Sequence, residues 1–510
     1  TVPRMAEITS EHVHAVDPDG VEDKGLRSGT LGLMGATVLG LASTAPVYSL
    51  AATIGLVVAA VGVYAPAFML IAFIPMLLTA FAYRELNSII PDCGTVFTWG
   101  TKAFGGHIGW MGGWAVAVTG IIFLGSAAQV TGTYLFDLIG NETLAESDLA
   151  VAAVGCVFII LMAYVAYRGL EIAVWMQTVL VALQYLALAM LSIACLYAVF
   201  NGNAGEGSMM PEWNWLNPFN VDFSSFVQAF LLCLFIYWGW DAILAVNEET
   251  KDPEKTPGRA ALIATVVLLV GYTVVTISTV SYAGVGDEGI GLANPEIQDD
   301  IFNAISLPLI GQGGTAFILL VTLISTAASA QTTILPTARG TLAMAVYKAL
   351  PSRFAQVSPK YMTPGFSTFV TCAIGLSFYV LMTILSDNML EDTISSISLA
   401  IAFYYALTAF ACAFYFRKEA FTGLRPFIFA FFLPIIGGIM LALTFIFSAI
   451  EMWSPDYGST SLMGVGSVFI IGVGSLLVGV VLMLLWQLRA PAFFRGETLT
   501  KDTPVLVPDE

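Results

Sequence analysis

Charged side chains are scarce in this sequence. Of its 510 residues, 11% are charged and 57% are hydrophobic, whereas an average soluble domain is ~25% charged and about 45–50% apolar. A soluble chain with so few charges could not cover its own surface. The net charge of −17 also argues against a nucleic-acid-binding protein. The composition therefore predicts a protein that crosses the lipid bilayer many times.

Histidine and cysteine are also rare, which removes most residue types on which metal and redox sites depend. There are three histidines, all outside the long apolar runs, and six cysteines, none in a Cys-x-x-Cys pair. We therefore expect no zinc site, no disulfide framework and no bound cofactor. The apolar runs offer no convergent nucleophile and base, so we expect no enzyme either. A cleaved signal peptide is not expected, because the chain begins with polar and acidic residues.

Long apolar runs make up most of the chain. A membrane-spanning helix needs about 20 mostly apolar residues, and twelve windows meet that requirement. The windows are residues 31–59, 66–89, 108–138, 149–167, 172–200, 226–244, 260–282, 316–346, 366–385, 394–416, 426–450 and 463–486. The expected fold class is an all-α polytopic membrane protein with 12 transmembrane helices.

The positions of lysine and arginine predict the orientation. Positively charged residues collect on the cytoplasmic side of membrane proteins. If the chain starts in the cytoplasm, all 19 fall on that side. We therefore expect a multi-pass protein of the plasma (inner) membrane with both termini cytoplasmic. The outer connections are acidic, for example at Glu206, Asp287 and Glu288, which either attracts cationic substrates or only aids solubility.

Two of the windows contain residues that interrupt a helix. In the first, Pro46 follows the small residues 43–45, and a proline removes a backbone hydrogen bond and opens the preceding turn. In the sixth, Gly239 stands within the aromatic stretch 237–241. These windows begin two five-helix halves, and transporters built from inverted repeats break matching helices at the substrate site. A proline kink and a helix-packing glycine are the alternatives.

Asp241 lies well inside the sixth window. A charge at membrane depth is costly, so such residues commonly mark a transport pathway or an ion-coupling site. A structural acid that is hydrogen-bonded to a neighbouring helix is the alternative. Asp241 is therefore a candidate both for substrate binding and for ion coupling.

Three motifs resemble those of the amino acid–polyamine–organocation (APC) superfamily of transporters. They are Tyr83-Arg84-Glu85 through Gly113-Trp114, Tyr237-Trp238-Gly239-Trp240-Asp241 with Glu248-Glu249, and Thr337-Ala338-Arg339 with Leu350-Pro351. The resemblance covers most of residues 25–420. It implies a permease with a LeuT-type fold, which is a 5+5 inverted repeat with discontinuous helices 1 and 6, followed by helices 11 and 12.

This fold would divide the chain into six parts. They are a cytoplasmic tail (1–28), the first repeat (29–200), an extracellular loop (201–225), the second repeat (226–416), helices 11 and 12 (417–489) and a second cytoplasmic tail (490–510). The substrate site is then expected between the two repeats, at the level of the helix breaks.

The resemblance also implies the site residues. Backbone N–H groups before Pro46 would receive a substrate carboxylate, carbonyls around Gly239 would take its amino group, and an aromatic ring would close over it. The expected substrate-binding residues are Ser43, Thr44, Ala45, Phe235, Tyr237, Trp238, Gly239 and Asp241. Ordinary aromatic packing is the alternative for the rings.

Four charged residues near the inner helix ends are candidates for an inner gate of ion pairs. They are Arg84, Glu248, Glu249 and Arg339. A solvated charged face is an equally good interpretation of the same residues.

The coupling ion is expected to be H⁺ or Na⁺. Proton-coupled members of the family often carry a lysine in helix 5, where this chain has Gln184. A glutamine does not titrate, so a proton would have to be carried by Asp241. Oxygen atoms of Ser325, Thr326 and Ser329 could coordinate Na⁺ instead, or bond within their own helix.

The expected function is secondary transport of an amino acid or a related small amine, with proton symport favoured on family prevalence. Exchange, Na⁺-coupled symport and a nutrient sensor that binds without transport are the alternatives. The motifs specify neither the oligomeric state nor which substrate is carried, so polyamine- and ethanolamine-like amines stay open.

Overall fold

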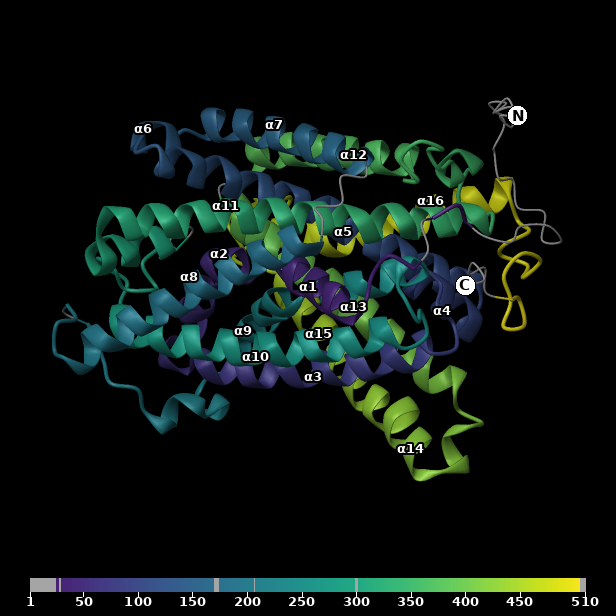
Figure 1. Cartoon of the computed structure of the whole chain (residues 1–510), viewed down its shortest axis with the longest axis horizontal. Coiled ribbons are helices and arrows are strands. Elements are labelled where there is room, and N and C mark those ends of the chain that lie inside the picture. Colours follow the sequence, from purple (N-terminus) through teal and green to yellow (C-terminus); the bar gives the residue numbers. More distant parts are fainter. Residues whose placement is uncertain are drawn as a thin grey trace, which may run out of the picture.

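A computed structural model describes residues 24–26, 29–168, 174–205, 207–298, 301–386 and 388–504. Within these ranges the chain forms a bundle of long helices and one short two-stranded hairpin (Figure 1). Most of the long helices run along the same axis of the molecule.

The first part of the chain contributes helices on both sides of the first interruption. They are α1 (Leu33–Thr44), α2 (Pro46–Val61), the 3₁₀ turn η1 (Gly62–Tyr64), α3 (Ala65–Asn87), α4 (Val96–Phe104), α5 (Gly106–Leu138), α6 (Glu142–Ala145), α7 (Asp148–Tyr167) and α8 (Val174–Phe200). The Ser147 hydroxyl caps α7 by accepting from the Ala150 N–H.

The second part begins after two short 3₁₀ turns, η2 (Trp213–Leu216) and η3 (Pro218–Asn220). Its elements are α9 (Phe223–Tyr237), the 3₁₀ helix η4 (Trp240–Glu249), α10 (Thr256–Ala283), α11 (Ile301–Val346), η5 (Ser352–Ala355), α12 (Gly365–Leu385), α13 (Met389–Tyr415), η6 (Ala420–Thr422), α14 (Leu424–Pro426), the π-helical η7 (Phe427–Phe432), α15 (Leu433–Met452), β1 (Ser461–Leu462), β2 (Val465–Gly466) and α16 (Ser467–Arg489).

Eleven helical segments of the described residues are long and apolar enough to cross a membrane, so the chain is a multi-pass helical membrane protein. The segment nearest the N-terminus, Leu33–Asn87, is 55 residues long and contains two of the sequence windows. It is counted once because η1 continues the helix from α2 into α3. The count alone therefore does not establish twelve separate helices.

One helix extends beyond its window. The sequence predicts a span from residue 316, whereas α11 begins at Ile301 and bends at Gly311, which has a φ of 67°. Glycine adopts positive φ without steric cost, so the helix direction changes there while the hydrogen bonding resumes. A stretch assigned to an outer connection is therefore helical.

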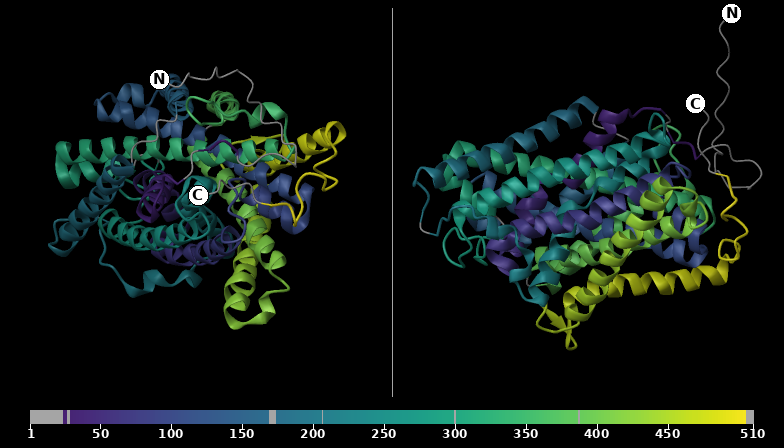
Figure 2. Two further views of the ribbon diagram at one scale, coloured as in Figure 1. Left: turned by 45° about the vertical axis from the view of Figure 1, so that its right-hand side comes forward. Right: turned by 90° about the horizontal axis from the view of Figure 1, so that it is seen from below.

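The interrupted helices lie in the middle of the bundle. α1 packs against α8, α10, α11 and η4, and α2 packs against α9 and α11. In Figure 1, α1 and α13 are central, whereas α7 and α12 pack together at one edge. Figure 2 shows α16 (yellow) along one side, with the β1–β2 hairpin at its start. The bundle thus surrounds the two breaks with helices.

Candidate functional site

The first break lies at Ala45, between α1 and α2. Ala45 has φ 45° and ψ 67°, and its N–H makes the last bond of α1, to the Ala42 carbonyl at 3.2 Å. Left-handed backbone is unusual for a residue other than glycine. Pro46 explains why the helix restarts here, because it has no N–H to donate and favours the first position of a helix.

The second break lies at Trp238 and Gly239, between α9 and η4. Trp238 is extended, with φ −70° and ψ 148°. Gly239 follows with φ 115° and ψ −20°, a conformation that is strained for any residue with a Cβ atom. The chain leaves one helix and enters the next within two residues.

The two breaks touch one another. A Cβ atom built on Gly239 would lie 2.8 Å from the carbonyl carbon and oxygen of Ser43 and 2.9 Å from the Thr44 nitrogen. Only a glycine allows this approach between two backbones. The structure therefore brings Ser43, Thr44, Ala45 and Gly239, which the sequence singles out separately, into one buried place.

Side chains of α8 and α11 reach the first break. The Ser329 hydroxyl donates to the Ser43 carbonyl at 2.7 Å. The Ser325 hydroxyl donates to Oε1 of Gln184 at 2.8 Å and accepts from the Tyr48 N–H at 3.4 Å. Nε2 of Gln184 is buried and has no hydrogen-bond partner among the described residues. Such a donor indicates a place for a water molecule or a ligand group.

Two other candidates, Thr326 and Arg84, have partners other than the first break and the other gate candidates. The Thr326 hydroxyl donates to the Thr322 carbonyl of its own helix at 2.9 Å. Arg84 pairs with Glu85 at 2.5 Å, and Glu85 in turn lies 3.3 Å from Arg425. Arg84 thus belongs to a different cluster from the other gate candidates.

Aromatic rings cover one side of the breaks. Phe235 meets Tyr48 edge-on with ring centres 6.2 Å apart and stacks on Trp238 at 6.5 Å. Trp238 also meets Phe123 at 5.3 Å. Tyr237 points elsewhere, because its hydroxyl donates to a backbone carbonyl of α3 at 2.9 Å. The rings of Phe235 and Trp238 therefore lie beside the breaks, whereas the Tyr237 hydroxyl is directed towards α3.

Asp241 is held by two tyrosines of α13. Its Oδ1 accepts from the Tyr405 hydroxyl at 2.9 Å and its Oδ2 from the Tyr404 hydroxyl at 3.3 Å. Tyr404 also accepts a hydrogen bond from Nε1 of Trp238. A chain of hydrogen bonds therefore joins an aromatic ring beside the breaks to the carboxylate. The sequence reasoning missed these tyrosines, although adjacent buried hydroxyls in an apolar window need polar partners.

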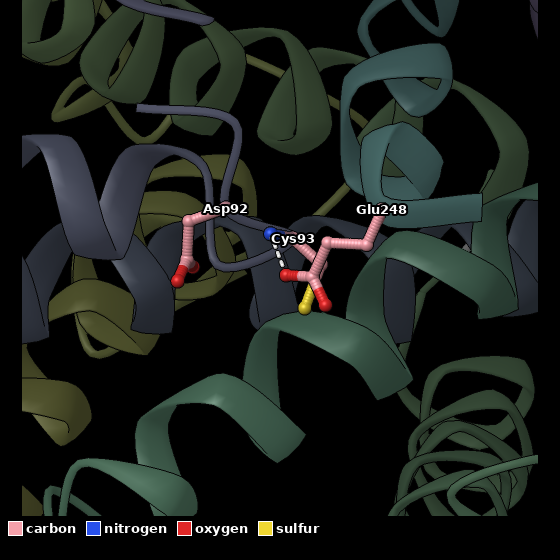
Figure 3. A group of neighbouring side chains, drawn as sticks. All are labelled: Asp92, Cys93 and Glu248. Carbon is pink, nitrogen blue, oxygen red and sulfur yellow. Dashed lines mark hydrogen bonds between the residues drawn. The ribbon is translucent and has the colours of Figure 1, made fainter. Parts of the chain in front are cut away.

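A buried ion cluster closes the end of the bundle that contains the α3–α4 connection. Nζ of Lys24 lies 2.7 Å from Oδ2 of Asp92 and 2.6 Å from Oε1 of Glu248. All three side chains are 0–1% exposed. The Cys93 N–H donates to Oε1 of Glu248 at 2.8 Å, as Figure 3 shows. The cluster joins the segment before α1, the α3–α4 connection and the end of η4.

The charges in this cluster stabilise one another. Burial alone would lower the pKa of the Lys24 ammonium, but the Asp92 and Glu248 carboxylates and the Cys93 thiol together hold that pKa well above its usual value. Burial would likewise raise the pKa of the Asp92 carboxyl, yet Lys24 and hydrogen bonds from Thr98 and Gly94 lower it. Lys24 and Asp92 are therefore both charged.

A separate ion pair lies beside this cluster. Arg339 contacts Glu249 at 2.6 Å, and both are buried. The Glu249 carbonyl accepts from the Thr30 N–H at 2.8 Å, and the Lys251 N–H donates to the Leu31 carbonyl at 2.8 Å. The segment before α1 is thus fixed to the end of η4 by its backbone as well as by Lys24.

A bundle of many membrane-spanning helices, with two of them broken where they meet, is typical of membrane transporters. The chain belongs to the amino acid permease family, whose profile matches residues 31–483. The resemblance to the APC superfamily is thereby confirmed, and with it the expectation of a transporter and not an enzyme.

Named relatives agree on transport but differ in what they carry. The chain is 24% identical to the low-affinity putrescine importer PlaP of Escherichia coli (strain K12) over 418 residues, which cover 80% of this chain and 86% of that protein. It is 24% identical to the methylthioribose transporter of Bacillus subtilis (strain 168), covering 59% and 64% of the two chains. It is 22% identical to the serine/threonine exchanger SteT of the same bacterium, covering 66% and 71%. Family membership therefore implies a small-molecule substrate.

Gly239→Ala tests the contact between the breaks. The added Cβ has no room against Ser43, and the positive φ adds strain of about 1–3 kcal/mol. We expect transport into proteoliposomes to be lost and the thermal unfolding midpoint to fall. Gly313→Ala is the matched control, because nothing lies within 4 Å of its added Cβ atom. Normal transport by the Gly239 variant would contradict the importance of this contact.

Proposed function

We propose that this protein is a secondary active transporter that moves an amino acid or a related small amine across the plasma (inner) membrane by alternating access. The contact of Gly239 with the backbone at Ser43 and Thr44 carries the proposal. At such interruptions, N–H and C=O groups lack helical partners and can bind the charged ends of a small zwitterion or amine.

We place the substrate at the two breaks. Phe235 and Trp238 supply aromatic surface there, and Asp241 connects to Trp238 through Tyr404. A substrate ammonium would be attracted both by the ring faces and by the carboxylate. Amino acids and simple amines share this ammonium group, and the two relatives that are named for putrescine and for serine and threonine fit the same chemistry.

The topology that we propose has twelve spans in a 5+5 inverted repeat, followed by two further helices. The 55 residues of Leu33–Asn87 would measure roughly 80 Å as a helix, at about 1.5 Å per residue. This length is more than twice the hydrocarbon thickness of about 30 Å, so the run would cross twice. The repeats would then be residues 29–200 and 226–416, with both tails in the cytoplasm.

The Lys24–Asp92–Glu248 cluster and the Arg339–Glu249 pair would form the inner gate. They fix the segment before α1 and the end of η4 to the body of the bundle, so these parts cannot separate while the pairs are intact. Lys24 and Asp92 thus join the predicted residues Glu248, Glu249 and Arg339 in this role, in place of Arg84. Opening towards the cytoplasm would require Lys24 and Arg339 to leave their carboxylates.

For the driving ion we favour the proton, carried by Asp241. A Na⁺ ion at the first break would have to displace bonds that already join Ser329 to the Ser43 carbonyl and Ser325 to Gln184. Asp241, by contrast, is bonded to neutral hydroxyl groups, which can accommodate either protonation state of a carboxyl group.

The topology is tested by labelling with an impermeant maleimide. Asn203 and Glu254 are both exposed, and the proposal places them on opposite sides of the membrane. A cysteine at 203 should react in intact cells, whereas one at 254 should react only after permeabilisation. The wild-type protein is the background control, since its six cysteines are buried or half-buried. The reverse pattern would exclude the twelve-span orientation.

Substitution of Phe235 tests the aromatic cover. Phe235→Ala should weaken substrate affinity roughly tenfold, since an aromatic contact contributes about 0.5–1.5 kcal/mol beyond its area. The control is Phe230→Ala in the same helix, a buried ring that stacks on Phe226. Each substitution leaves a cavity and should lower stability, by about 3–5 kcal/mol. Equal effects on transport affinity would show that Phe235 only packs.

Uptake into proteoliposomes under an imposed pH or Na⁺ gradient identifies the coupling ion. We expect uptake driven by the pH gradient in the wild type and its loss in Asp241→Asn, which keeps the shape of the side chain but cannot exchange a proton. Uptake that follows Na⁺ and survives in the variant would remove Asp241 from coupling. Counterflow without a response to either gradient would identify an exchanger.

A further inference from the structure

The cluster beside the inner gate has the composition of a metal site. Asp92, Cys93 and Glu248 each offer one ligand atom, and these atoms all lie within 4.8 Å of one another. All three residues are buried, and Figure 3 shows the Glu248 carboxylate next to the Cys93 thiol. The Lys24 ammonium lies among them, 2.7 Å and 2.6 Å from the carboxylates and 3.7 Å from Sγ. The Lys24 ammonium therefore occupies the position that a metal ion would take.

The ligand atoms are held in position without the help of Lys24. Oδ1 of Asp92 accepts from the Thr98 hydroxyl at 2.7 Å and from the Gly94 N–H at 2.8 Å. Oε1 of Glu248 accepts from the Cys93 N–H at 2.8 Å. Hydrogen bonds of this kind orient metal ligands in known sites. The carboxylates would therefore remain close together if the lysine were withdrawn.

The charge of the ammonium does not balance the cluster. Lys24 brings one positive charge to the two carboxylates of Asp92 and Glu248. Oε2 of Glu248 is buried and has no hydrogen-bond partner among the described residues. A buried carboxylate oxygen without a partner is costly. A divalent cation would bring a second positive charge and bind this oxygen, while the Cys93 thiol would lose its proton to water when its sulfur coordinates the ion.

The ligand set also indicates the class of metal. Mg²⁺ and Ca²⁺ take oxygen ligands, whereas a sulfur ligand favours zinc and similar borderline ions. Zinc commonly takes four ligands, and three protein atoms with one water molecule satisfy that number.

We propose that Asp92, Cys93 and Glu248 form a binding site for a divalent cation of the zinc class, and that Lys24 is its tethered competitor. The two cations exclude one another, so the metal binds when the segment before α1 is withdrawn. It thereby favours conformations in which Lys24 is released. The apparent affinity of the wild type is reduced by the fraction of molecules in which Lys24 is in place. The binding claim holds whether or not the protein transports as proposed above.

Titration of the purified full-length protein with Co²⁺ and Zn²⁺ tests this site. We expect Lys24→Met to bind one ion per chain at least tenfold more tightly than the wild type. Its Co²⁺ complex should show the ultraviolet charge-transfer band of a thiolate ligand, and the double variant Lys24→Met/Cys93→Ser should lose that band. If the methionine variant does not fold, Lys24→Gln carries the same test, because it also removes the charge.

Lys102→Met is the matched control. Lys102 is another buried lysine near this end, but its ammonium contacts only the backbone carbonyls of Lys501 and Thr503 among its hydrogen-bond acceptors. This variant should gain far less affinity than Lys24→Met, because the Lys102 ammonium acts on Asp92 only through space and does not occupy the site. The proposal is overturned if the Lys24 variant shows no thiolate band, if the band persists without Cys93, or if the Lys102 variant gains affinity to the same extent.

Discussion

The structure depends on the close approach of two backbones at the point where both of their helices are broken. Because Gly239 has no Cβ atom, its backbone can lie directly against the peptide that joins Ser43 and Thr44. A helix in lipid must satisfy its own polar groups, and broken helices occur only where protein or a cavity takes over that task. Here Ser329 takes over for the Ser43 carbonyl, and Ser49 for the Thr44 carbonyl at 2.6 Å. Side chains of α2 and α11 thus donate hydrogen bonds to the carbonyl groups that the first break leaves without helical partners.

The end of the bundle that contains the α3–α4 connection meets a different constraint, the burial of charge. Removing ions from water costs several kcal/mol for each ion, so a buried pair is retained only where geometry and hydrogen bonds compensate. Lys24 and Arg339 each meet a carboxylate at 2.6 Å, and the carboxylates belong to adjacent residues of one chain segment. Such a cluster is stable while its charges are paired. It also becomes hydrated as soon as its parts separate, since each charge regains water when it leaves its partner.

The sequence predicted the features that depend on neighbouring residues. The apolar windows identified the membrane-spanning character, and Pro46 and Gly239 marked the two breaks because their effects on the backbone are local. Family motifs pointed to Glu248, Glu249 and Arg339. The sequence could not show that Glu248 meets Lys24, 224 residues away, or that Tyr404 and Tyr405 hold Asp241 from another helix. Local spacing also could not show that the side chains of Cys93 and Glu248 lie close together, since these residues are 155 positions apart.

The position of Lys24 in the chain has a consequence for how its ion pairs form again if they separate. Eight residues, 25–32, join it to the first residue of α1. A group held by so short a linker has an effective concentration in the millimolar range at its own binding place. If the pairs separate, their formation again would be an intramolecular encounter, independent of the amount of protein in the membrane. A metal ion would displace Lys24 only if its concentration, divided by its dissociation constant, exceeded the same ratio for the tethered lysine. The length of the linker therefore sets the metal concentration that is needed.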